Sequence, residues 1–149
     1  ITLIILVLFL YSCGYSSIYK NQKSQNFKIN IVEVTGDNEM NNLIKNEIKL
    51  YSGQNTTNIY NLKIDTDYTK ETLTKDSAGV ITDYKLSVTS IFTIDLKEKA
   101  KVIKLKETIN IKNQSDSFEQ NIYEKNIKRI FASSIREKLI SKIFSINDN

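Results

Sequence analysis

The chain has 149 residues and a formal net charge of +4, with 40% hydrophobic and 26% charged residues, one cysteine and no histidine. This composition excludes a wholly disordered chain, and the length fits one domain with a buried core. The single cysteine excludes an intramolecular disulfide framework, and the lack of histidine removes the commonest general base and transition-metal ligand. We therefore expect a protein that is not an enzyme and that binds no metal or cofactor.

Residues 1–12, ITLIILVLFLYS, carry no charge and are almost all apolar. A helix of this length spans only about 18 Å, which is too short for the roughly 30 Å hydrocarbon core of a bilayer but is typical of the h-region of a signal peptide. We expect further residues to precede Ile1, because neither Met nor a basic n-region is present.

The apolar run ends in Leu10-Tyr11-Ser12-Cys13, which resembles a bacterial lipobox. We therefore expect Cys13 to be the lipidated N-terminus of the mature protein, and residues 13–26, which are rich in Ser, Asn, Gln and Lys, to form a tether. The alternative is a buried strand with an incidental cysteine, since cysteines are often buried. The folded domain is expected over residues 27–149.

The domain begins with a predicted strand and an amphipathic helix. Phe27 to Val34 starts with alternating apolar and polar residues and predicts a strand. Gly36 and Asp37 break this pattern, and Asp37 is a good N-cap for a helix that continues up to Gly53. The apolar stripe of this helix, which we expect to pack on a sheet, comprises Met40, Leu43, Ile44, Ile48 and Tyr51.

Two longer strands follow, and they predict a hairpin. Ile59 to Thr72 alternates cleanly, and Lys75 to Gly79 has the residue types of a turn. Val80 to Leu96 keeps one unbroken face, and it would span roughly 55 Å if fully extended. Strands of this length are rare, so we expect strong twist or a bulge, with one end of the hairpin projecting beyond the core.

The last two predicted elements are a strand and a long helix. Lys97 to Lys101 predicts a charged turn, and Val102 to Asn113 predicts a strand whose core face is interrupted by Glu107. Ser115 to Ser117 is expected to cap the final helix. The apolar stripe of this helix comprises Ile127, Ile130, Phe131, Ile135, Leu139, Ile143 and Ile146.

The predicted order is therefore β-α-β-β-β-α. The first strand, helix and second strand form a βαβ unit, and the next two connections are short hairpins. Each helix has one apolar stripe, which suits two helices on a single face of a mixed four-stranded sheet and leaves the other face free. The predicted fold class is α/β (α+β), a two-layer sandwich.

Three sequence features, in the order of the chain, match one known family. They are Cys13-Gly14-Tyr15 at the lipidation-type cysteine, Asp83-Tyr84-Lys85-Leu86 in the long strand, and the final helix with Arg129-Ile130-Phe131-Ala132 and Ile135-Arg136-Glu137-Lys138-Leu139. Together they resemble the LPS-assembly lipoprotein LptE family. The resemblance covers the chain from Cys13 to about Ile146, and it depends on the order and spacing of the elements, because no single motif is specific.

The resemblance implies a lipid-anchored outer-membrane protein that faces the periplasm, plugs an LptD-like β-barrel and contacts lipopolysaccharide on its way to the outer leaflet. A polar sheet face suits a wet barrel lumen, and basic side chains can pair with lipid A phosphates. The best candidates for this pairing are Lys75 in the hairpin turn and Lys85 beside it on the long strand. Taken alone, either lysine is more often a solvated surface residue.

Aromatic residues on the predicted hairpin suggest where a partner binds. Tyr60, Tyr68, Tyr84 and Phe92 cannot all lie in the middle of the core if the hairpin projects. Exposed aromatics of this kind usually mark a partner surface, so we expect Tyr68, Tyr84 or both to contact the barrel. The alternative is that twist folds the hairpin back over the domain and buries them.

Three other functional classes are the alternatives. An outer-membrane adaptor or scaffold with another partner has the same sequence features. An enzyme would need a nucleophile and a base, and pairs such as Ser133, Ser134 and Lys138, or Asp65 and Asp67, are far more often solvated surface when histidine is absent. Nucleic-acid binding is disfavoured, because a secretion signal places the protein away from nucleic acid.

Overall fold

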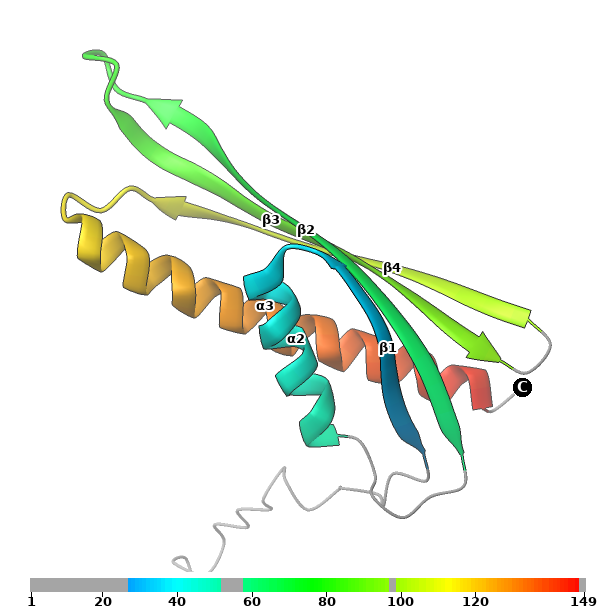
Figure 1. Cartoon of the computed structure of the whole chain (residues 1–149). Coiled ribbons are helices and arrows are strands. Elements are labelled where there is room, and N and C mark those ends of the chain that lie inside the picture. Colours follow the sequence, from blue (N-terminus) through cyan, green and yellow to red (C-terminus); the bar gives the residue numbers. More distant parts are fainter. Residues whose placement is uncertain (1–26, 52–57, 97–98, 148–149) are drawn as a thin grey trace, which may run out of the picture.

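The computed structural model describes residues 27–51, 58–96 and 99–147. The predicted signal-peptide region, Cys13 and the tether lie outside these residues. The order of the described elements is β-α-β-β-β-α, as predicted (Figure 1). They are β1 (Lys28–Gly36), α2 (Asn38–Tyr51), β2 (Ile59–Lys75), β3 (Ile81–Leu96), β4 (Lys99–Lys112) and α3 (Ser117–Asn147).

The four strands form one mixed sheet in the order β1-β2-β3-β4. β1 runs parallel to β2, and the β2–β3 and β3–β4 pairs are antiparallel. Helices α2 and α3 lie on the same face of this sheet, so the molecule has two layers (Figure 1). The predicted two-layer α+β fold with a mixed four-stranded sheet and two helices on one face is therefore confirmed.

The core lies between the sheet and the two helices. Alternate residues of β2 and β3 point into it, and Leu62, Ile64 and Phe92 are each at most 1% exposed. Phe92 is thus a core residue and takes no part in an exposed aromatic surface. From α3, Ile135, Leu139 and Ile143 are fully buried against the same cluster.

The start of α2 is fixed by its cap and by a close approach of two backbones. The Asp37 carboxylate accepts a hydrogen bond of 2.8 Å from the Met40 amide, which confirms the predicted N-cap. Gly36 has a φ of 87°, and a Cβ there would lie 2.0 Å from the Thr66 carbonyl oxygen. Only glycine fits at this point, because both the backbone conformation and the space exclude a side chain.

The β2–β3 hairpin projects beyond the rest of the sheet (Figure 1). β1 pairs with β2 only as far as Thr66, β4 pairs with β3 as far as Asp83, and residues 71–80, around the turn, are all exposed. The β2–β3 register shifts between Thr72 and Lys75, which is the irregularity expected for strands of this length. Lys75 is the last residue of β2 and pairs with Ile81, so its predicted place in the turn was wrong. The pairing of β2 with β3 continues up to the turn, which is closed by hydrogen bonds from the Ala78 and Val80 amides to the Asp76 carboxylate.

Two other predictions near the end of the chain were wrong. The predicted charged turn includes Lys99 to Lys101, but these residues begin β4 and continue its pairing with β3. Lysines are compatible with an edge strand because their charged ends remain in water. Ile130 is 59% exposed and lies outside the core stripe of α3. At about 100° per residue, Ile130 lies roughly 100° around the helix from the buried Phe131, which places its side chain away from the sheet.

The N-terminal cap of α3 lies where the sequence indicated. The Asp116 carboxylate accepts hydrogen bonds from the Phe118 and Glu119 amides at 2.8 and 2.9 Å. The buried stripe of α3 also includes Ala132 and Ile140, which the periodicity did not single out. The side chain of Ile146 lies outside the described part of the chain.

Candidate functional site

The two lysines predicted to bind lipopolysaccharide lie on different parts of the hairpin. Lys75 is exposed at the end of β2 and forms no ion pair with a described residue. Lys85 is partly buried on β3, on the sheet face without helices, and is paired in register with Glu71. Because Lys75 pairs with Ile81, four residues of β3, or about 13 Å, separate the two positions. They are therefore not adjacent, in contrast to the prediction.

Tyr68 is a half-buried residue with partners on α3. Its hydroxyl donates a hydrogen bond of 2.8 Å to the Glu124 carboxylate. The Lys128 ammonium group lies 4.4 Å from the centre of its ring, within the range of a cation–π interaction. Burial, followed by the hydrogen bond to Glu124, raises the pKa of Tyr68 above its ordinary value.

Tyr84 is covered in a similar way, by a residue of the neighbouring strand. The Lys70 ammonium group lies 4.4 Å from the centre of the Tyr84 ring and 2.7 Å from the second carboxylate oxygen of Glu124. The hairpin thus does not fold back over the domain, and the two tyrosines are not fully exposed to solvent. Instead, the first half of α3 extends beneath it (Figure 1).

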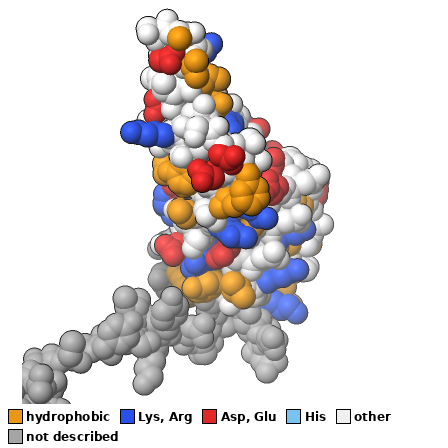
Figure 2. Space-filling view, turned by 90° about the vertical axis from the view of Figure 1, so that its left-hand side faces the viewer, with side chains coloured by type: hydrophobic (Ala, Val, Ile, Leu, Met, Phe, Trp, Pro, Cys, Tyr) orange, Lys and Arg blue, Asp and Glu red, His pale blue; other side chains and the backbone are white. Residues whose placement is uncertain are grey.

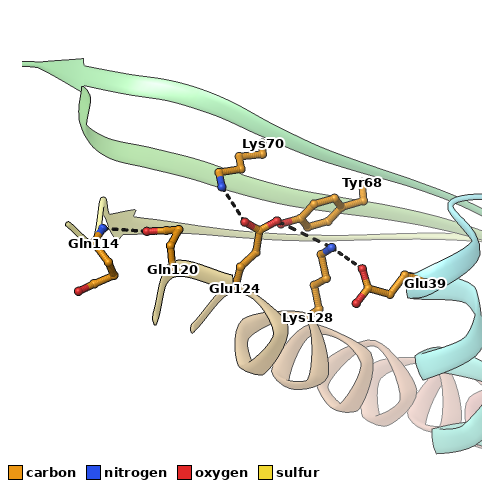
Figure 3. Close-up of polar contacts among 7 residues, drawn as sticks. All are labelled: Glu39, Tyr68, Lys70, Gln114, Gln120, Glu124 and Lys128. Atoms are coloured by element: carbon orange, nitrogen blue, oxygen red, sulfur yellow. Dashed lines mark hydrogen bonds and ion pairs between the residues drawn. The ribbon is translucent and has the colours of Figure 1, made fainter. Parts of the chain in front are cut away.

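Five residues from three elements form what we call the Glu124 cluster (Figure 3). Its members are Glu39 of α2, Tyr68 and Lys70 of β2, and Glu124 and Lys128 of α3. Lys128 completes it with contacts of 2.6 Å to Glu39 and 3.8 Å to Glu124. The cluster joins β2, beyond the end of its pairing with β1, to both helices, so it helps to hold the hairpin in one direction.

The electrostatics of this cluster favour a charged carboxylate. Burial by itself raises the pKa of Glu124, but the hydrogen bonds from Lys70 and Tyr68 and the charges of Lys70 and Lys128 outweigh it and lower this pKa. Sequence periodicity missed Glu124 because a polar residue was not expected on a core face. One signal was available, since Glu124 lies three residues before the buried Ile127 and seven before the buried Phe131, at helical spacing.

The sheet face opposite the helices is polar, as predicted. Neighbouring side chains pair across it, with Asn30 donating to Asn61 at 2.9 Å and Thr35 donating to Asp65 at 2.8 Å. An ion pair of 3.0 Å joins Lys63 to Glu33, and this hydrogen-bonded contact raises the pKa of Lys63. A shallow depression of about 190 Å³ lies between these pairs and Ile91 and Thr93 of β3.

Apolar side chains are also exposed, on the hairpin and on the outer side of α3. Figure 2 shows hydrophobic side chains along the projecting hairpin, where Leu73 and Val80 are 45% and 57% exposed. On α3, Phe118, Ile122 and Ile130 are exposed at four- and eight-residue spacing. Exposed apolar groups in such rows are available to a partner.

Four of the five residues named as possible catalytic groups are engaged in structural contacts. Ser134 donates a hydrogen bond to Glu107 at 2.9 Å, and Lys138 contacts the same carboxylate at 2.6 Å. Ser133 accepts a hydrogen bond from Arg136, and Asp65 accepts one from Thr35. Within the described ranges, no three His, Cys, Asp or Glu side chains are grouped so that they could hold a metal ion. No described helix is long and apolar enough to span a bilayer.

Comparisons with known proteins agree with this fold. No protein-family model matches the chain, and no curated protein matches it. Rare lipoprotein B from Shewanella oneidensis has a similar structure, with a TM-score of 0.57 at 16% identity over 79% of this chain and 99% of that chain. A candidate lipoprotein from Caulobacter crescentus gives a TM-score of 0.52 at 11% identity over 80% and 92% of the two chains. At these identities the likeness shows a common fold.

Proposed function

We propose that this protein is a lipid-anchored outer-membrane lipoprotein of the LptE type. In this proposal it binds and plugs an LptD-like β-barrel, assists the transport and assembly of lipopolysaccharide, and catalyses no reaction. The observation that supports it best is the fold shared with almost the whole of rare lipoprotein B, in a chain whose only cysteine ends a lipobox-like run. Neither feature would suffice alone, because many lipoproteins have the cysteine motif and a fold does not fix a function.

The arrangement of the domain is consistent with a plug. The open sheet face offers hydrogen-bonding groups from Asn30, Asn61 and Thr35 to a water-filled lumen. The projecting hairpin adds an extended surface, and the Glu124 cluster gives it a defined direction. A plug needs a fixed shape more than a deep pocket, since its contacts are spread over the wall of the barrel.

Co-purification tests the proposed partner. The full chain, tagged at its C-terminus and extracted from its own outer membrane in mild detergent, should retain the LptD-like barrel in a one-to-one complex. A tagged outer-membrane lipoprotein of unrelated fold serves as the control. Recovery of a different stoichiometric partner, without the barrel, would favour the adaptor function instead.

Mass spectrometry of the membrane-extracted protein tests the anchor. We expect the mature chain to begin at Cys13 and to carry the mass of several acyl chains, which together hold a protein firmly in a bilayer. An unmodified thiol with an intact leader would overturn the lipid anchor. Cys13→Ala, which leaves residues 27–149 unchanged, should abolish both processing and acylation.

A further inference from the structure

The end of the sheet opposite the hairpin turn is formed by four strand ends, and we call it the base. The starts of β1 and β2 meet there, because Lys28 pairs with Ile59. The end of β3 and the start of β4 lie at the same end, because Leu96 pairs with Lys99. Helix α2 runs back toward the base from the end of β1 (Figure 1). The end of α3 lies there too, because the rings of Phe27 and Phe144 are 5.4 Å apart.

The base combines unpaired lysines with exposed apolar side chains. Lys28, Lys49, Lys99 and Lys101 are exposed, and none of them forms an ion pair with a described residue. Leu50 and Ile59 are 72% and 56% exposed at the same end. Asp95 is exposed there as well, so among the described residues of the base the lysines outnumber the carboxylates.

The opposite end of the molecule, the hairpin tip, has a different charge pattern. Its lysines are balanced by an equal number of carboxylates, which are distributed among them. Asp83, for example, is opposite Lys112 in the β3–β4 register, and hydrogen bonds from Thr74 and Thr82, together with the charge of Lys112, lower the pKa of Asp83. The charged residues at this end are Lys75, Lys85, Lys112, Glu71, Asp76 and Asp83. An anionic surface would therefore attract the base more strongly than the tip.

The chain that precedes the domain joins it at the base. Residues 13–26 lead to Phe27, which is only 1% exposed and lies at the start of β1. Fourteen residues reach at most about 50 Å even when fully extended. An anchor at Cys13 therefore keeps the base near the bilayer, and the hairpin tip lies at the far end of the domain.

We propose that the base docks on the surface of the bilayer that carries the anchor, before the protein meets its partner. The lysines of the base would lie among anionic phospholipid head groups, and Leu50 and Ile59 would enter the interfacial region, as in peripheral proteins that combine both features. The hairpin then points away from the membrane. This inference depends on the lipid anchor of the proposed function but not on its barrel partner.

Tryptophan fluorescence can locate the docked surface, because the chain contains no tryptophan of its own. Leu50→Trp reports on the base and Val80→Trp on the tip, and both positions are more than half exposed. Each full chain is purified from membranes and reconstituted into vesicles of phosphatidylcholine and phosphatidylglycerol with brominated acyl chains. We expect bromine to quench the fluorescence of the L50W chain strongly and that of the V80W chain little.

Charge reversal tests the contribution of the lysines. Each lysine near an anionic surface contributes roughly a fivefold factor, so Lys49→Glu with Lys101→Glu should weaken docking by more than about twentyfold and remove most of the L50W quenching. The matched control is Lys112→Glu with Lys125→Glu, which changes the net charge equally with two exposed lysines away from the base. The control should leave the quenching unchanged, and circular dichroism verifies the fold of each variant.

The possible failures have separate meanings. Flotation of the vesicles on a density gradient shows whether the chain is attached to them. If the chain floats with the vesicles but its L50W and V80W forms are quenched equally, docking by the base is overturned, while the lipid anchor is still supported. If K49E/K101E leaves the quenching intact, attraction to anionic lipid is overturned. If the full chain does not float at all, both the anchor and the docked base are overturned.

Discussion

Two regions of the same hairpin are stabilised by different kinds of contact. Near the base, Leu62 and Ile64 of β2 and Ile94 of β3 are at most 1% exposed beneath the helices. Beyond Thr66, where β1 ends, the contacts of the hairpin with the helices include hydrogen bonds, ion pairs and cation–π contacts. The helix-facing side chains of β2 therefore change from apolar to polar beyond Thr66, whereas β3 keeps Leu86 and Val88 fully buried opposite Lys70 and Tyr68.

The two kinds of contact affect different properties of the domain, namely its free energy of unfolding and the direction of the hairpin. Apolar burial contributes about 25 cal/mol per Å², so the free energy of unfolding should depend mainly on the packed region. Polar contacts that are partly exposed contribute less, and they respond to salt and pH. The contacts of Tyr68 and Lys70 with Glu124 therefore orient the hairpin but supply only a small part of the free energy of unfolding.

The largest expected effect is a difference in the free energy of unfolding between two variants, each with one substitution in one of the two regions. Leu139→Ala removes a fully buried side chain and should lower the free energy of unfolding by about 2–5 kcal/mol. Leu73→Ala, on the projecting hairpin, changes a side chain that is 45% exposed and should cost at most about 1 kcal/mol. Urea unfolding monitored by circular dichroism measures both. Equal losses would show that the hairpin belongs to the packed region.

Removing the charge of Glu124 should have an intermediate effect. Its side chain is only 15% exposed, and Glu124→Gln removes the negative charge and one of the two oxygens that accept hydrogen bonds from Lys70 and Tyr68, so we expect a loss of about 1–2 kcal/mol at neutral pH. Because the pKa of Glu124 is lowered in the folded protein, this stabilisation is fully present above the ordinary value of about 4.5 and is lost as the pH falls through the folded pKa.

The pH series provides the control for this substitution. The difference in stability between the wild type and E124Q should be constant from neutral pH to about 5 and should shrink in more acidic solution. Glu119→Gln, at an exposed position one turn earlier on α3, should show a much smaller difference at every pH. A difference for E124Q that does not change with pH would mean that the carboxylate charge is not what stabilises the cluster.

Most of the fold could be predicted from the sequence because it depends on local patterns. Alternation in Ile59 to Thr72 and the Asp37 cap each identify an element without knowledge of its neighbours. The errors arose where tertiary contacts decide. Lys99 to Lys101 looked like a turn by charge, yet pairing with β3 makes them a strand. Ile130 fits an apolar stripe, but the sheet contacts a different side of α3.

The site was less predictable, because it depends on how far one element extends beneath another. Tyr68 and Tyr84 were identified as important hairpin residues, and the structure places both beside lysines. Periodicity could not show that α3 begins early enough for Glu124 to reach Tyr68, a residue 56 positions away. Long-range polar pairs of this kind leave no repeating pattern in one sequence.

Hydrogen exchange can show whether the hairpin contacts the proposed barrel. With one face of the hairpin open, backbone amides over residues 66–86 should exchange faster than those of the packed region in the free protein. In the complex with the barrel they should become slower, and Tyr68, Tyr84 or both should lose solvent exposure. The segment of β3 from Phe92 to Ile94, whose two end residues are fully buried, serves as the internal reference. Identical protection of residues 66–86 with and without the barrel would exclude the hairpin as the contact.

The smallest expected effect concerns the two predicted lysines of the hairpin. Lys75→Glu with Lys85→Glu should weaken lipopolysaccharide binding by up to about tenfold at low salt, because exposed charges contribute at most about 1 kcal/mol each and are screened. The effect should be smaller at moderate salt. Lys125→Glu with Arg129→Glu makes the same charge change at two exposed positions of α3 and should leave this binding unaltered. Since about 13 Å separates the two hairpin lysines, each should bind a different anionic group, and the single variants should be additive. If the double variant binds lipopolysaccharide as the wild type does at both salt concentrations, these lysines only make the hairpin soluble.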